Sequence, residues 1–160
     1  GNSIVKYDLD NGTFSDIVNN IPNNGINKEI KLLIKGDILY ASIGSNTNSG
    51  VVDSPGAEVD IPSFHWILSG KKYGSGGTSG FCKYSESAQE DSTINEGKLS
   101  NASIISCNLI DNEITTYATG IRNVKGYSIT SDGKIIAIVG GVEDSGARPL
   151  ANDKDYIYIG

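Results

Sequence analysis

The sequence is poor in the residues that build metal centres and membrane spans. Its 160 residues include two cysteines, one histidine and four prolines. Cys82 and Cys107 do not have the spacing of a metal-binding pair, and the single histidine has no second histidine with which to share a metal. No apolar run approaches the roughly 20 residues that a helix needs to cross a bilayer. The sequence therefore predicts neither a Cys/His metal centre nor a membrane span.

Basic residues are also in the minority. The chain has 13 Lys and Arg against 19 Asp and Glu, for a formal net charge of −6. The basic residues are scattered along the chain and form no stripe. Nucleic acids and anionic membranes are recognised by clustered positive charge, so both are poor candidates for partners.

A helical pattern is missing as well. The best candidate, Asn27–Leu33, is too short and runs directly into a hairpin signal. Twenty glycines beside four prolines suit a loop-rich protein built from strands. The predicted fold class is all-β.

What the sequence does contain is an internal repeat. Ile4 aligns with Ile104, Val5 with Ile105, and, after a slip in register, ILYASIG (38–44) aligns with KIIAIVG (134–140). Self-similarity of this kind marks arrays and propellers, whose units bury their apolar faces against neighbouring units.

Each repeat reads as four short antiparallel strands. Apolar and polar residues alternate with a period of two, and turn residues such as Asp10-Asn11-Gly12 separate the runs. The strands are predicted at 3–9, 13–18, 30–34, 38–43, 103–109, 114–118, 126–129 and 134–139, with another opening at 155–160. Four antiparallel strands make one propeller blade, so we expect one partial β-propeller domain, 1–160, with roughly two to three blades.

An insertion of about residues 45–100 interrupts the pattern. It is rich in Ser, Gly and Asn, and loops of this length are usually functional or disordered. The apolar run Ile61–Leu68 holds the only His and the only Trp, and we expect it to pack on the propeller surface. His65 is a candidate catalytic base or part of a sugar-stacking site; the alternative is a histidine that only packs.

The sequence leaves two alternatives for the cysteines. Cys107 takes the core-facing place that Tyr7 holds in the first repeat, which predicts a buried and inert thiol. A disulfide between Cys82 and Cys107 is the alternative.

Two further segments carry candidate site residues. Arg122 lies in Ile121-Arg122-Asn123, which joins the predicted strands 114–118 and 126–129. Its guanidinium carries a permanent positive charge, which suits a planar anionic ligand. Glu143, Asp144 and the carbonyls around Gly140-Gly141 offer oxygen ligands of the kind that Ca²⁺ accepts. A solvated acidic turn is the alternative for the second segment.

These segments resemble a known family. TYATGIRNVKGYSITSDGKIIAIVGGVEDSGARPLANDKDYIYIG is similar to the signature segment of the glucose/sorbosone dehydrogenase family, with RPLAND its most specific part together with Arg122-Asn123. ILYASIGSNTNSGVVD and FHWILSGKKY resemble a branch of that family that carries a long insertion.

The resemblance implies a six-bladed β-propeller that is exported and oxidises sugars with pyrroloquinoline quinone and Ca²⁺ in a central cleft. By match of motif, Arg122 falls on the quinone-facing Arg and Asn123 on its neighbour. Gly141 and Val142 fall on the Gly-Pro pair whose carbonyls hold Ca²⁺. An extracellular or cell-envelope location and a sugar or glycan partner are expected on the same ground.

The sequence departs from the family at the catalytic centre. The family's catalytic His falls near Asn27, and an amide cannot take the proton that sugar oxidation releases. His65 is the only imidazole that is able to replace it. Two hypotheses follow: a quinoprotein sugar dehydrogenase, or a non-catalytic propeller that binds a glycan or a protein at the cell envelope. Under either, we expect the rest of a propeller or a second copy to cover the terminal sheets.

Overall fold

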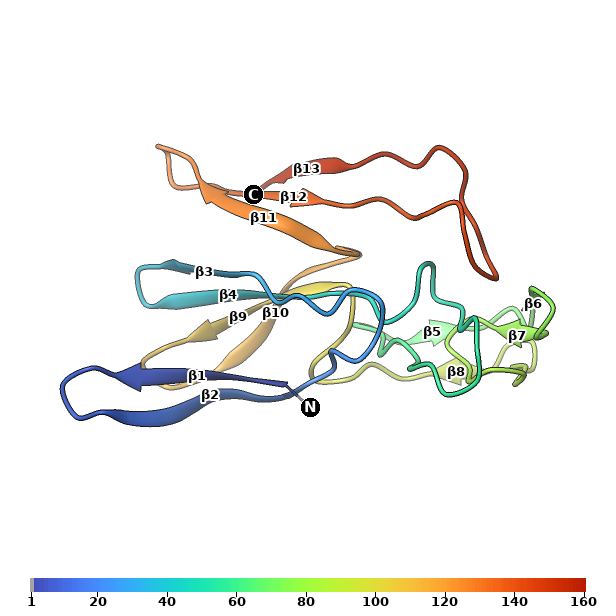
Figure 1. The fold of residues 1–160 in the computed structure, drawn as a ribbon, viewed down its shortest axis with the longest axis horizontal. Helices are drawn as coiled ribbons and strands as arrows, with labels where there is room; N and C mark the ends of the chain where they lie inside the picture. The colour runs from blue at the N-terminus through green and yellow to red at the C-terminus, as the bar shows by residue number, and fades with distance from the viewer. Residues whose placement is uncertain (1) are drawn as a thin grey trace.

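The chain folds into small antiparallel sheets without helices. The structure, a computed structural model, describes residues 2–160, so Gly1 of the predicted domain lies outside the described residues. Within them every regular element is a strand, and no helix is present that would be long and apolar enough to cross a membrane (Figure 1). The predicted all-β class is confirmed, and the one short helical candidate, Asn27–Leu33, contributes only the start of a strand.

Nine strands form three sheets. The strands are β1 (Asn2–Asp8), β2 (Thr13–Ile21), β3 (Leu32–Lys35), β4 (Ile38–Ile43), β9 (Ser103–Asn108), β10 (Ile114–Thr119), β11 (Val124–Ile129), β12 (Ile135–Val139) and β13 (Tyr156–Ile159). β1 and β2 pair as a hairpin, a four-stranded sheet has the order β10-β9-β4-β3, and a three-stranded sheet has the order β11-β12-β13. All of these pairs are antiparallel.

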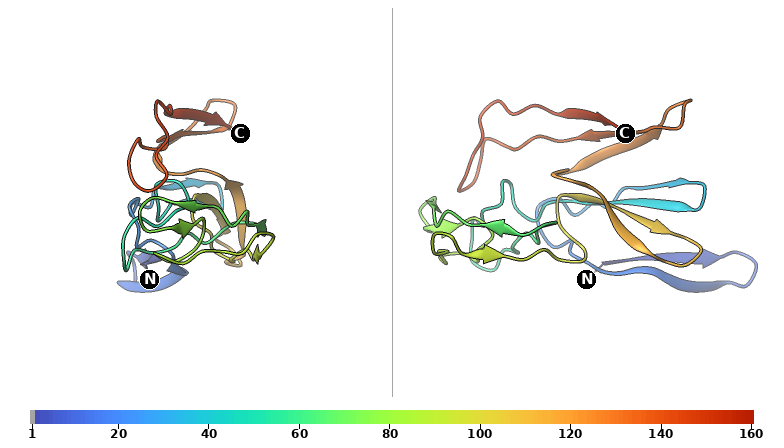
Figure 2. Two further views of the ribbon diagram at one scale, coloured as in Figure 1. Left: turned by 90° about the vertical axis from the view of Figure 1, so that its right-hand side faces the viewer. Right: turned by 180° about the vertical axis from the view of Figure 1, so that it is seen from behind.

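The four-stranded unit expected from the repeat is present in the central sheet. Its two halves, β3–β4 and β9–β10, are separated in sequence by the insertion and still pair along β4 and β9. The insertion itself contains four two-residue strands: β5 (Trp66–Ile67) pairs with β8 (Thr93–Ile94), and β6 (Lys72–Tyr73) pairs with β7 (Thr78–Ser79). It extends from one end of the sheets (Figures 1 and 2).

The repeat reaches the level of strand register. The β1–β2 hairpin contains two register shifts and the β9–β10 hairpin contains one. At one shift in each hairpin the second strand has an extra residue, which is Ile17 in the first hairpin and Tyr117 in the second. A bulge of this kind increases the twist of a strand pair. Its recurrence at aligned positions supports the interpretation of the two hairpins as copies of one structural repeat.

The turns of the two hairpins also match. The Gly12 N–H donates to the Asp8 carbonyl at 2.9 Å, and the Asn112 N–H donates to the Asn108 carbonyl at 2.8 Å. Gly12 and Asn112 both have positive φ, near 60°, which Gly and Asn tolerate better than other residues. The aligned segments β1 and β9 therefore occupy equivalent places within their hairpins, as the repeat predicts, although β9 also pairs with β4.

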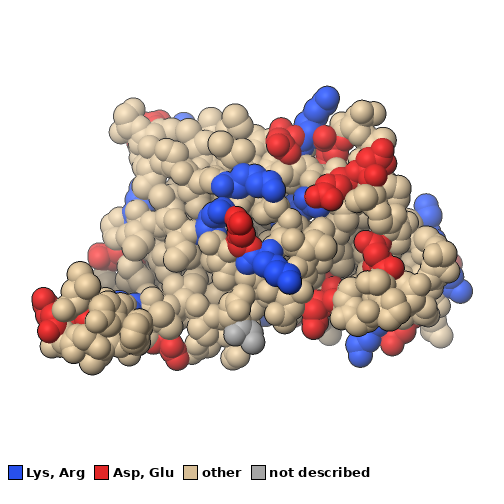
Figure 3. Space-filling model, in the orientation of Figure 1, with Lys and Arg blue, Asp and Glu red and all other residues tan. Residues whose placement is uncertain are grey.

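The sheets stack face to face (Figures 1 and 2). The central sheet buries side chains on both of its faces. Along β4, Leu39, Ala41 and Ile43 pack in a cluster with β1 and β2, whereas Tyr40 packs against a second cluster formed with β11 and β12. This alternation is the period-two pattern of a strand that is covered on both sides. On the face seen in Figure 3, acidic and basic side chains are interspersed.

Cys107 lies in the first core cluster and is 1% exposed. Both cysteines are free thiols, so the alternative of a disulfide with Cys82 is wrong. Burial raises the pKa of the Cys107 thiol, which lowers its reactivity, and the predicted buried, inert thiol is confirmed.

Removing core volume from the central sheet should destabilise the fold strongly. Ile105 is 0% exposed in the cluster between the central sheet and the β1–β2 hairpin. Ile105→Ala is expected to lower the free energy of unfolding by about 2–5 kcal/mol, because the cavity adds to the lost burial. Urea denaturation measures the change. Ile110→Ala, at a position 76% exposed, is the control and should change stability by less than about 0.5 kcal/mol; equal effects would contradict this assignment of the core.

Candidate functional site

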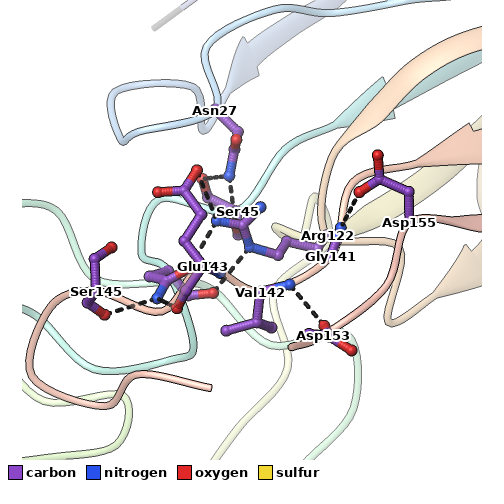
Figure 4. A network of polar contacts seen from close by, with 10 residues as sticks. Asn27, Ser45, Arg122, Gly141, Val142, Glu143, Ser145, Asp153 and Asp155 are labelled. Atoms are coloured by element: carbon purple, nitrogen blue, oxygen red, sulfur yellow. Dashed lines mark hydrogen bonds and ion pairs between the residues drawn. The ribbon is translucent and has the colours of Figure 1, made fainter. Parts of the chain in front are cut away.

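Arg122 lies on the connection between β10 and β11, with a side chain that is 11% exposed. Its Nε donates to the carbonyl oxygen of Asn48 at 3.0 Å, and its Nη2 donates to Asn48 Oδ1 at 2.8 Å (Figure 4). One edge of the planar guanidinium, which would otherwise grip an anion with two parallel hydrogen bonds, is thus occupied by a residue of the insertion.

Asn48 has its full set of hydrogen bonds. Besides Arg122 Nη2, its Oδ1 accepts the N–H of Glu143 at 2.9 Å. Its Nδ2 donates to the carbonyls of Glu143 at 2.8 Å and Ser145 at 3.0 Å. The residue is 6% exposed, and one buried amide joins the β10–β11 connection, the start of the insertion and the loop after β12. We name Arg122, Asn48 and Glu143 the Asn48 clasp.

The ion pair in the clasp is its weakest part. Arg122 Nη2 lies 3.8 Å from Glu143 Oε1, and the Glu143 side chain is 67% exposed. A long contact to a solvated carboxylate contributes about 0–1 kcal/mol, so the uncharged amide of Asn48 holds the guanidinium more firmly than the carboxylate does.

Asn27, on which the resemblance places a catalytic His, lies close to the clasp (Figure 4). Its Nδ2 donates to the Ser45 carbonyl at 3.2 Å and to Ser45 Oγ at 2.8 Å, while the Ser45 N–H donates to the Arg122 carbonyl at 2.9 Å. A Cβ on Gly44 would lie 2.4 Å from the Asn27 carbonyl oxygen, so glycine permits this close approach. The structure brings Asn27 and Arg122 together through Ser45, with Asn27 acting as a hydrogen-bond donor.

Gly141 and Val142 lie beside an acidic segment. The Gly141 N–H donates to Asp155 Oδ1 at 3.0 Å, and the Val142 N–H donates to Asp153 Oδ2 at 2.7 Å. The hydrogen bond from Val142 and a further one from the Tyr156 hydroxyl lower the pKa of Asp153. The carboxylates therefore fix the turn after β12 through its backbone N–H groups.

The cofactors implied by the resemblance do not fit these residues well. An anionic quinone at Arg122 would have to compete with Asn48 for the guanidinium. Near Gly141 and Val142 the two aspartates already accept backbone hydrogen bonds, and within residues 2–160 there is no group of three or more His, Cys, Asp or Glu that would hold a metal ion. Asn123, the expected neighbour of the quinone, is 8% exposed and accepts the Gly140 N–H with its carbonyl at 2.9 Å.

His65 lies on the insertion, just before β5, and is exposed. In residues 2–160 it forms no hydrogen bond or ion pair with Arg122 or Asn27. Its neighbours Phe64 and Trp66 stack with ring centroids 4.7 Å apart and remain 47% and 42% exposed. The expectation that this run packs on the rest of the protein is wrong for these side chains, because the rings pack on each other and on Phe81 instead.

Sequence reasoning missed two residues of this region, Asn48 and Asp60. Asp60 is 7% exposed and accepts hydrogen bonds from the Asn46 N–H and the Thr47 hydroxyl. Burial raises the pKa of the Asp60 carboxyl, and these hydrogen bonds only partly oppose that effect. The available signal was an acid placed between two apolar neighbours, Val59 and Ile61.

No protein-family model matches the chain, and neither the curated proteins nor the solved structures contain a match.

Replacing the central amide of the clasp by a carboxylate should destabilise the protein. In Asn48→Asp, an acceptor oxygen replaces Nδ2 and faces the carbonyls of Glu143 and Ser145. We expect the free energy of unfolding to fall by about 2 kcal/mol, as for other buried polar groups that lose their partners. Asn95→Asp makes the same change at an exposed asparagine and should be nearly neutral. Equal stability of the two variants in urea denaturation would show that the clasp is not structural.

Asp60 should make the fold less stable as the pH rises. The pKa of Asp60 is higher in the folded protein than in the unfolded chain, where it is about 3.9. The protonated carboxyl therefore contributes its full stability at pH values below the unfolded pKa. This contribution is lost as the pH rises through the folded pKa. Asp60→Asn keeps the shape and removes this titration. The stability of the wild type relative to Asp60→Asn should therefore decrease from about pH 3 to pH 7. Asp37→Asn, at an exposed position, is the control; a difference that is constant with pH would contradict the buried carboxylate.

Proposed function

We propose that this chain is part of a β-propeller of the sugar-dehydrogenase type that binds a glycan without oxidising it. The proposal combines the resemblance of the sequence to the glucose/sorbosone dehydrogenase family with the state of the residues at the expected catalytic centre. An extracellular or cell-envelope location belongs to the proposal and rests on the resemblance alone.

The propeller architecture draws support from the repeat. One complete four-stranded meander lies between a two-stranded and a three-stranded sheet, and the three stack face to face. Blades of a propeller are four-stranded antiparallel sheets that cover one another in this way. The β1–β2 hairpin corresponds to the last two strands of one blade, and β11–β13 to the first three of another.

Exposed apolar side chains mark the faces and edges where further strands would pack. All four residues of β13 are exposed, among them Ile157 at 68% and Ile159 at 61%. On β3, Leu32 and Ile34 are 51% and 59% exposed. Contiguous exposed apolar surface marks an interaction site, and in this proposal the remainder of a propeller or a second copy covers it.

The observation that carries the loss of catalysis is the hydrogen bonding of Asn27. Its side-chain N–H groups point to two oxygen atoms of Ser45, and an amide has no basic lone pair for a substrate proton. Proton transfer by a positioned base contributes roughly 10²–10⁴-fold to the rate of such reactions. Arg122 is held by Asn48, so the cation that would orient an anionic quinone serves the fold.

The proposal predicts no quinone-dependent sugar oxidation. The measurement is dye-linked oxidation of glucose with added pyrroloquinoline quinone and Ca²⁺. A ligand of the folded state must raise its melting temperature, so we also expect no shift with quinone and Ca²⁺ together.

His65→Ala is the informative variant for the competing hypothesis. Turnover that His65→Ala abolishes would make His65 the base, and turnover that survives the substitution would show that another residue serves. Either result would overturn the non-catalytic assignment.

A further inference from the structure

A second site, separate from the Asn48 clasp, lies on the insertion. A cleft of about 600 Å³ opens there, within the range of about 300–1,000 Å³ that small-molecule sites occupy. Its polar and aromatic lining comes from four stretches of the chain: Asn24, Asn46, Glu58, Lys83, Tyr84 and Glu86. We name it the insertion cleft.

Tyr84 divides the insertion cleft from a smaller neighbour. Its ring also lines a cavity of about 220 Å³ that includes Asp53 and Tyr73. A Cβ on Gly76 would lie 2.5 Å from the Tyr84 ring, so the ring can rest there only against glycine. One aromatic ring thus borders two adjacent spaces, as a platform between two subsites would.

Hydrogen bonds to buried residues hold the walls of the insertion cleft. The turn that presents Lys83, Tyr84 and Glu86 is closed by the Glu86 N–H and the Lys83 carbonyl at 2.9 Å. Its Ser85 N–H donates to Oγ1 of Thr78, which is 1% exposed, at 2.9 Å. On the opposite wall, Asn46 Nδ2 donates to the Val59 carbonyl at 2.9 Å. A site held in this way loses little entropy when a ligand binds.

Several polar groups of the cleft have no partner within residues 2–160. The side chains of Glu58, Lys83 and Glu86 form no ion pair or hydrogen bond there, and the Tyr84 hydroxyl forms no hydrogen bond. Asn46 is 7% exposed, and its Oδ1 is buried without a partner. The exposed side chains of Glu58, Lys83 and Glu86 are thus available to a ligand, whereas Asn46 Oδ1 lies out of reach of solvent.

From this arrangement we infer that the insertion cleft binds a neutral oligosaccharide, with Tyr84 as the stacking platform between two sugar rings. Carboxylates and amides accept and donate the hydrogen bonds of sugar hydroxyls, and an aromatic face covers the apolar C–H face of a pyranose ring. The site deepens the proposed glycan-binding function and rests on it.

The charges of the two cavities favour a neutral ligand. Glu58 and Glu86 line the insertion cleft together with one lysine, Lys83. Asp53 lines the smaller cavity, beside which the cations of Lys71 and Arg148 lie, so neither sign of charge dominates the two cavities. Cations already occupy the neighbouring aromatic ring: Lys71 Nζ and Arg148 lie 5.3 and 5.6 Å from the centroid of Tyr73. A basic peptide would have to displace them, whereas an uncharged saccharide would not.

Calorimetric titration of the full chain with cellotetraose, maltotetraose, xylotetraose and chitotetraose tests the inference. At least one should bind with a dissociation constant of about 1 mM or lower. Tyr84→Ala should weaken that binding about tenfold, and Gly76→Ala should weaken it by displacing the ring without removing it. Phe64→Ala, which truncates an exposed aromatic outside both cavities, is the matched control and should leave the affinity unchanged.

The outcomes of these titrations distinguish failure of the insertion cleft as a site from failure of the proposed glycan-binding function. Binding that Tyr84→Ala and Gly76→Ala leave unchanged would refute the insertion cleft and leave glycan binding elsewhere intact. If none of the four saccharides binds, or tetralysine or tetragalacturonate binds in their place, both the cleft assignment and the glycan function fail. Circular dichroism of each variant confirms that lost binding does not reflect lost fold.

Discussion

The buried amide of Asn48 is the constraint on which the arrangement of the loops depends. Sheets are held by ladders and apolar faces, but the segments that leave them have neither, and their polar groups need partners once buried. Asn48 supplies two donors and two acceptor directions at 6% exposure, and it uses all of them. One side chain thereby ties a loop of the central sheet to the three-stranded sheet, and Arg122 is recruited into the same network.

The longer strands were predictable because the signals that mark them, alternating apolar residues and turn residues, lie within a few positions of one another in the sequence. The run 38–43 was expected residue for residue, and most other boundaries differ by one or two positions, because alternation and turn residues mark them within the sequence itself. The pairs β5–β8 and β6–β7 were not predictable, since two-residue strands are too short to show a period. Pairing of β4 with β9 across the insertion followed from the repeat.

The candidate site was predictable only in part. The sequence pointed to Arg122 and Asn27, and in the structure both are hydrogen-bonded to Ser45. The Asn27 side chain donates to Ser45 Oγ, and the Ser45 N–H donates to the Arg122 carbonyl. The hydrogen-bond partner of a guanidinium depends on which residue the fold brings next to it. Here that partner is Asn48, which lies far from Arg122 in the sequence. The burial of Asp60 likewise depends on how the insertion closes over it, which no local pattern records.

A difference in hydrogen-bond saturation separates the two polar regions of the molecule. Around Arg122 the amide of Asn48 is saturated, so a ligand would have to break existing bonds before forming its own. In the insertion cleft the turn is anchored through backbone groups and Thr78, while the side chains of Lys83 and Tyr84 remain available. Because binding free energy is the surplus over what must be broken and ordered, the second arrangement is the better binding site. Arg122 and Asn27, which the sequence pointed to, are bonded within the scaffold, and the insertion cleft offers the freer polar groups.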